Sequence, residues 1–89
     1  MKVIFLKSFL NDIRKVKDKR LKSKIRQIIL KIEAAKSLEE IAGAKKMKGY
    51  SIAYRIRIGD YRIGLYKEND CVELARVLKR NDIYKVFPK

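Results

Sequence analysis

The sequence has no histidine and no tryptophan, and it contains only one cysteine, Cys71, and one proline, Pro88. Without histidine and with a lone cysteine, the chain cannot by itself form a Cys/His zinc site, a Ser-His-Asp triad, a Cys-His nucleophile pair or an internal disulfide. Glycine is also scarce, and no linker or low-complexity stretch divides the 89 residues. We therefore expect a single domain, residues 1–89, whose chemistry is free of metal and cofactor.

Long hydrophobic runs are missing as well. Near the start of the chain, four consecutive apolar residues, 3–6, are followed by a lysine, whereas a signal-peptide core needs roughly 7–15 and a membrane span about 20. The sequence therefore predicts a cytoplasmic protein without membrane association.

Positive charge is what the sequence has in excess. Its 24 lysines and arginines outnumber 10 acidic residues, which gives a formal charge of +14, while 47% of the residues are hydrophobic. The chain is too apolar for a disordered basic tail and basic enough to attract polyanions over long distances. A folded cation of this kind indicates an anionic partner, which net charge alone leaves open as nucleic acid, acidic protein or lipid surface.

Apolar spacing predicts helices in the first half of the chain. One face of a helix over residues 21–35 is formed by Leu21, Ile25, Ile28, Ile29 and Ile32. Ser8 is a possible N-cap for a preceding helix over residues 9–18, and residues 3–6 are typical of a short strand. Ser37 followed by Glu40 matches a capping box for one further helical turn that ends at Gly43.

From Tyr54 onward the apolar period becomes two, which is typical of strands. The two runs on either side of Gly59-Asp60 predict a β-hairpin, and a third strand follows over residues 72–78. Residues 81–87 are expected to form a turn or short helix. The predicted fold is α+β in the order β-α-α-β-β-β with a short C-terminal α, in which two helices pack on a small antiparallel sheet.

A two-residue turn at Gly59-Asp60 sets the register of the hairpin. Arg57 then lies opposite Arg62, a like-charge pair that is disfavoured by some tenths of a kcal/mol to about 1 kcal/mol. A bound anion would offset this repulsion, because arginine offers bidentate donors to phosphate. Gly64 opposite Arg55 would leave the neighbouring surface open. We expect a concave, arginine-lined sheet face, with a merely solvated face as the alternative.

Other residues extend this positive face. Tyr66 falls on the same side as the arginines, and Tyr84 follows Arg80 by four residues. The third strand and the chain after it add Arg76, Lys79, Arg80 and Lys85, and the expected RNA contacts are Lys45, Lys46, Lys48, Lys79 and Tyr66. Helix lysines such as Lys22 and Lys24 are interpreted as solvated surface that steers association.

Three segments in succession resemble the RelE/ParE superfamily of toxins from prokaryotic toxin–antitoxin pairs: 46–49 (KMKG), 54–63 (YRIRIGDYRI) and 77–84 (VLKRNDIY). The resemblance implies one of two activities. RelE-like members are ribosome-dependent endoribonucleases that cut mRNA in the decoding site, whereas ParE-like members act on DNA gyrase. The basic set that ParE-like members lack is filled here by Arg55, Arg57, Arg62, Arg80 and Tyr84, which favours the RelE-like branch.

The resemblance also implies a mechanism and partners. A ribose 2′-OH would attack the adjacent phosphate, with Arg57 and Arg62 as the phosphate clamp, Arg80 on the leaving-group side and Arg55 on the flanking phosphate. Tyr84 is the candidate base, although a phenol titrates near about 10 and needs nearby arginines to favour its anion.

Lys79 stands where many relatives carry histidine. The expected partners are the ribosome with mRNA and an acidic antitoxin that covers the basic face or displaces the C-terminal element. A gyrase inhibitor, a non-catalytic nucleic-acid-binding module and an inactive toxin are the alternatives.

Overall fold

Five strands form one mixed sheet in the order β1-β5-β4-β3-β2 in the computed structural model, which describes residues 1–88. The strands are β1 (Lys2–Phe5), β2 (Ala44–Lys46), β3 (Ala53–Ile58), β4 (Tyr61–Glu68) and β5 (Cys71–Lys79). The helices are α1 (Lys7–Lys15), α2 (Lys19–Ala34) and α3 (Arg80–Val86), with a 3-10 turn, η1, at Leu38–Glu40. The α+β fold and the order of its predicted elements are confirmed.

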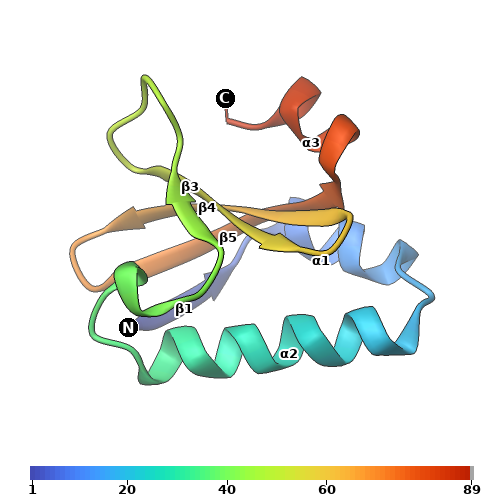
Figure 1. The fold of residues 1–89 in the computed structure, drawn as a ribbon, viewed down its shortest axis with the longest axis horizontal. Helices are drawn as coiled ribbons and strands as arrows, with labels where there is room; N and C mark the ends of the chain where they lie inside the picture. Colours follow the sequence, from blue (N-terminus) through green and yellow to red (C-terminus); the bar gives the residue numbers. More distant parts are fainter. Residues whose placement is uncertain (89) are drawn as a thin grey trace.

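Helices cover both faces of the sheet. α1 and α2 lie on one face and α3 lies on the other (Figure 1). The main core joins the two N-terminal helices to the sheet through Phe9, Ile25, Ile32, Ile56, Ile63, Leu65 and Leu74. A smaller cluster beneath α3 contains Ala53, Ala75, Ile83 and Phe87. The sheet is therefore apolar on both sides, and α3 occupies part of the face that was expected to be open.

The first helix begins and ends earlier than predicted. Leu6, not Ser8, is the N-cap of α1, and the hydroxyl of Ser8 donates instead to the carbonyl of Ala75 at 2.6 Å. The helix ends at Lys15 because Asp18 caps the next one: its carboxylate accepts from the backbone N–H groups of Arg20 and Leu21 at 2.9 and 3.3 Å. α2 accordingly begins at Lys19, two residues before its predicted start.

The sheet departs from the expected antiparallel arrangement in one pair of strands. β1 runs parallel to β5. The chain between these two strands, which includes α1 and α2, is long enough for the crossover connection that a parallel pair requires. β2, a strand of three residues, was not predicted. The hairpin register is as predicted, with Arg57 opposite Arg62 and Arg55 opposite Gly64. The turn at Glu40 also forms, and its carboxylate accepts from the N–H groups of Lys36 and Ser37.

No helix within residues 1–88 is long and apolar enough to cross a membrane. The same residues contain no group of three or more His, Cys, Asp or Glu side chains placed to hold a metal ion.

Candidate nucleic-acid interface

The predicted arginines lie on one face of the sheet. We call Lys45 on β2, Arg55 and Arg57 on β3, and Arg62 on β4 the arginine face. Lys45 pairs with Arg55, and Arg57 pairs with Arg62. Since Gly64, two residues after Arg62, contacts Phe87, this is the face that carries α3. Alternation along the strands therefore brings the four cations together, as predicted.

Arg62 does not project from this face as a free cation. Its side chain is only 8% exposed, and Nη1 donates to the carbonyls of Gly59 and Tyr61 at 2.8 and 2.9 Å. The carbonyls of the turn thus stabilise the guanidinium beside Arg57. These carbonyls supply part of the compensation that a bound anion was expected to provide, and Arg62 braces the turn between β3 and β4.

Arg57 and Arg55 differ in their exposure and in their hydrogen bonds. Arg57 is exposed, and its backbone N–H donates to the carbonyl of Gly43. Arg55 is half-buried, and its Nη1 donates to the same carbonyl at 3.0 Å. Within residues 1–88, Arg57 is therefore the arginine of this pair whose guanidinium makes no hydrogen bond.

The surface beside Gly64 is closed, contrary to the expectation that it is open. A Cβ at Gly64 would lie 2.7–2.8 Å from three carbon atoms of the Phe87 ring. Glycine is required here because the chain after α3 folds back onto the sheet. The face is thus not a bare concave sheet but a basic margin beside a covering helix.

The end of β5 brings Arg80 and Tyr84 to this margin. The backbone N–H of Arg80 donates to the carbonyl of Asp60 in the β3–β4 turn at 2.8 Å. Tyr84 lies one helical turn further along α3 and is 48% exposed. Lys79 is exposed, but it lies opposite Tyr61, which packs against the main core, so it is on the helical side of the sheet and not on the arginine face as expected. The turn, Arg80 and the exposed tyrosine therefore belong to one end of the molecule.

The other predicted RNA contacts are spread more widely. Lys46 pairs with Tyr54, whose ring packs against the main core, so Lys46 points to the helical side of the sheet. Lys48 is exposed between β2 and β3. Tyr66 is half-buried, and its ring lies 5.1 Å from that of Phe87. These positions leave Lys45 as the lysine of β2 that shares the arginine face.

Arg76 does not extend the positive field as expected. Its Nε and Nη2 atoms donate to the carboxylate of Asp12 at 2.7 and 3.1 Å, and Asp12 is only 5% exposed. The hydrogen bond that Arg76 donates to Asp12, opposed by burial and aided by the negative charge of Asp12, raises the pKa of the Arg76 guanidinium. This is the only ion pair within residues 1–88. Arg55, Arg57, Arg62 and Arg80 are therefore not held by carboxylates of the described chain.

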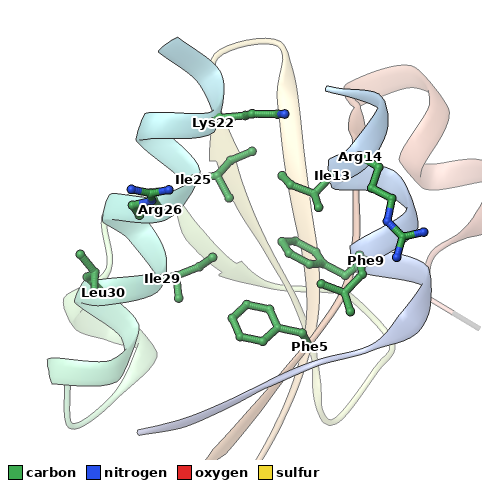
Figure 2. Close-up of a pocket in the computed structure, with 10 residues that line it drawn as sticks. Phe5, Phe9, Ile13, Arg14, Lys22, Ile25, Arg26, Ile29 and Leu30 are labelled. Carbon is green, nitrogen blue, oxygen red and sulfur yellow. The ribbon is translucent and has the colours of Figure 1, made fainter. Parts of the chain in front are cut away.

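The structure also has an apolar groove between α1 and α2 that was not predicted from the sequence. It has a volume of about 500 Å³ and is lined by Phe5, Phe9, Leu10, Ile13, Ile25, Ile29 and Leu30, with Arg14, Lys22 and Arg26 also along it. Phe9, Ile13, Ile25 and Ile29 point toward the space between the helices (Figure 2). The available signal was Leu10 and Leu30, two large apolar residues outside the predicted core stripes.

Comparison with known proteins identifies the family. Residues 3–84 match the family described as the ParE toxin of the parDE type II toxin–antitoxin system. The chain is 40% identical to Toxin RelE3 of Methanocaldococcus jannaschii, and the match covers 99% of this chain and all of that protein. This chain belongs to the RelE/ParE superfamily of toxins.

Two solved structures have the same fold. The toxin in the RelB-RelE antitoxin-toxin complex from Methanococcus jannaschii superimposes with a TM-score of 0.82 at 38% identity, covering 96% of this chain and 99% of that one. The YoeB dimer from Staphylococcus aureus has a TM-score of 0.69 at 20% identity, covering 85% of this chain and 92% of that one. The similarity to the YoeB dimer supports the shared fold alone, whereas the similarity to the RelB-RelE complex also relates this chain to a RelE toxin.

Proposed function

We propose that this RelE/ParE toxin is a ribosome-dependent endoribonuclease that cuts mRNA in the decoding site and so inhibits translation. The observation that carries the proposal is the end of the molecule where the β3–β4 turn meets α3. There Arg57 and Tyr84 are exposed, Arg80 is tied by its backbone to the turn, and none of the three pairs with a carboxylate of the described chain. The two arginines suit a phosphate backbone.

The chemistry assigned to this end is transfer of the phosphoryl group within the RNA. The ribose 2′-oxygen bonds to the adjacent phosphorus as its proton passes to the Tyr84 oxygen, and the bond from phosphorus to the 5′-oxygen breaks as that oxygen takes a proton from water. A 2′,3′-cyclic phosphate and a 5′-hydroxyl result. Arg57 stabilises charge on the phosphate oxygens, Arg80 lies toward the leaving oxygen, and Arg55 lies near the flanking phosphate. One such donor is worth roughly 10²–10³ in rate.

Arg62 takes a different role from the one predicted for it. Its guanidinium donates to the two carbonyls that frame the β3–β4 turn, and the turn in turn accepts the N–H of Arg80. Arg62 therefore positions Arg80 in this proposal, while Arg57 makes the direct contact with phosphate. Dependence on the ribosome follows because this small open surface cannot align the reacting atoms alone, and alignment supplies about 7–11 kcal/mol.

The test is cleavage of a defined message on programmed ribosomes. We expect the native toxin to cut within the decoding site and Arg57→Ala to lose about 10²–10³-fold in rate. Lys31→Ala is the matched control, because Lys31 is exposed on α2, which covers the other face of the sheet. If neither the native toxin nor the control variant cuts the message, the proposal is overturned. DNA breaks with inhibited supercoiling would establish the gyrase inhibitor in its place.

Two further outcomes separate the remaining alternatives. Binding of RNA without product, weakened by Arg57→Ala with a smaller salt dependence, would identify a non-catalytic nucleic-acid-binding module. If native protein neither cuts nor binds while a Lys79→His variant gains cleavage, the native chain is an inactive toxin.

We propose that the antitoxin binds in the groove between α1 and α2, in place of the basic face or the C-terminal element that the sequence led us to expect. Phe5, Leu10 and Leu30 are 44%, 40% and 58% exposed, and they are three of the five large hydrophobic side chains exposed within residues 1–88. A concentration of this kind marks an interaction surface. The charged side chains along the groove, Arg14 and Arg26 among them, are basic, which fits an amphipathic helix with an acidic border, such as an acidic antitoxin would supply.

Leu30→Glu tests this assignment. Leu30 is largely exposed, so the substitution leaves the fold intact while placing a carboxylate against the apolar side of the bound helix. We expect antitoxin affinity to fall at least tenfold and cleavage by the free toxin to stay unchanged. Gln27→Glu makes the same charge change at an exposed α2 position outside the groove lining. Equal affinities for both variants would contradict the assignment.

A further inference from the structure

The strand that leads into α3 contains a bulge. Gly64 pairs with Arg76 and Leu65 pairs with Leu74, so Ala75 is an extra residue on β5 between two regular stretches. A bulge bends its strand and re-aims the residues that follow. The residues that follow here are 77–79 and, with no intervening loop, Arg80 at the start of α3. The direction of the end of β5 therefore sets where Arg80 and Tyr84 lie.

Two polar side chains of α1 hold this bulge. The hydroxyl of Ser8 donates to the carbonyl of Ala75 at 2.6 Å. Asp12, one helical turn later on the same side of α1, accepts from the side chain of Arg76 and from the backbone N–H of Val77 at 3.1 Å. Three consecutive residues of the bulged strand are thus tied to one helix.

The start of α1 is tied to the same point. The backbone N–H of Leu6 donates to the carbonyl of Leu74 at 3.0 Å, where the parallel pairing of β1 with β5 ends. The chain leaves the sheet at Leu6 and crosses the bulge as α1. The helix that carries Ser8 and Asp12 is therefore anchored at its first turn to the strand that it clamps.

A buried ion pair does not by itself show that the two charged residues stabilise the fold. The cost of desolvating the two charges often equals their attraction, and apolar side chains of similar volume hold a helix to a sheet at least as well. The best-attested use of such a pair is to fix register. Asp12 fits that use, since its carboxylate bonds both to a side chain and to the backbone on the far side of the bulge.

We infer that Ser8 and Asp12 are positioning residues that fix the bulge of β5 and thereby place Arg80 and Tyr84 beside Arg57. The inference rests on the proposed nuclease function for its catalytic consequence. Its structural part, that α1 controls the end of β5, stands on the hydrogen bonds alone.

The experiment combines amide hydrogen exchange with turnover on programmed ribosomes. In Ser8→Ala and in Asp12→Asn we expect exchange of the Val77 and Arg80 amides to accelerate at least tenfold, with amides of β3 unchanged. Turnover should fall about 10–100-fold at unchanged KM, since a displacement of about 1 Å can cost that much. Ser8→Thr keeps the hydroxyl and should restore both readings.

Ile32→Val is the control for a merely structural effect, because Ile32 is fully buried in the main core on α2 and makes none of the side-chain hydrogen bonds that hold the bulge. Its loss of thermal stability should leave turnover unchanged at a temperature where all variants are folded. Unchanged exchange at Arg80 in both clamp variants would overturn the inference. It would also be overturned if exchange accelerated while turnover held, or if Ile32→Val slowed turnover equally.

Failure of the proposed function gives a different pattern. If the native toxin does not cut mRNA, the exchange readings in Ser8→Ala and Asp12→Asn still decide whether α1 holds the end of β5.

Discussion

Replacing Gly64 by alanine should loosen α3 from the sheet. The added Cβ would meet the Phe87 ring at 2.7–2.8 Å, about 1 Å closer than an ordinary carbon contact. Phe87 is buried and its ring packs on Tyr66, so it cannot swing freely into solvent. Overpacking of this kind costs about 1–3 kcal/mol. Alanine recovers about 0.4–1 kcal/mol by restricting the unfolded chain. The net loss should be about 1–2 kcal/mol.

Urea unfolding of a double-mutant cycle measures this contact. Gly64→Ala should lower the midpoint, whereas in a Phe87→Leu background the same change should cost under about 0.5 kcal/mol, because the smaller side chain makes room for the methyl group. An equal cost of Gly64→Ala in both backgrounds would refute the argument that Phe87 occupies this space. A stabilising Gly64→Ala in the native background would refute it more strongly.

Three further substitutions test other parts of the account. Asp18→Ala removes the N-cap of α2 and should cost about 1 kcal/mol in the free energy of unfolding by urea; no change would contradict the capping role. Arg76→Ala leaves the Asp12 carboxylate buried without its partner and should cost about 3–5 kcal/mol, so a midpoint shift below that of Asp18→Ala would contradict the burial argument. Tyr84→Phe keeps the ring but removes the proton acceptor, and should slow turnover about 10²–10⁴-fold without changing the thermal midpoint; native turnover would remove Tyr84 from the mechanism.

The sequence predictions that are confirmed depend on patterns within short stretches of the chain. The hairpin register follows from a two-residue turn and a period of two, both contained within residues 54–65. The stripe on α2 likewise needs only its own spacing. β2 was missed because three residues are too few to show a period.

The errors share a different cause, which is contact between distant parts of the chain. Gly64 looked like an opening because nothing near it in sequence indicates that Phe87 returns to fill the space. Arg76 looked like its exposed neighbours because its partner, Asp12, lies 64 residues away. Arg62 was placed on the correct face, but strand alternation says nothing of where a long side chain bends. The sequence thus predicted which residue types lie at the site, but not which of their side chains are held by contacts with other parts of the chain.

The most direct test of the nuclease account uses a message with a single 2′-deoxynucleotide at the mapped cut site on programmed ribosomes. The account predicts that cleavage at that position stops, and that the unmodified message yields a 2′,3′-cyclic phosphate and a 5′-hydroxyl. Continued cleavage at the 2′-deoxy position would contradict it, because the attacking oxygen would then come from elsewhere.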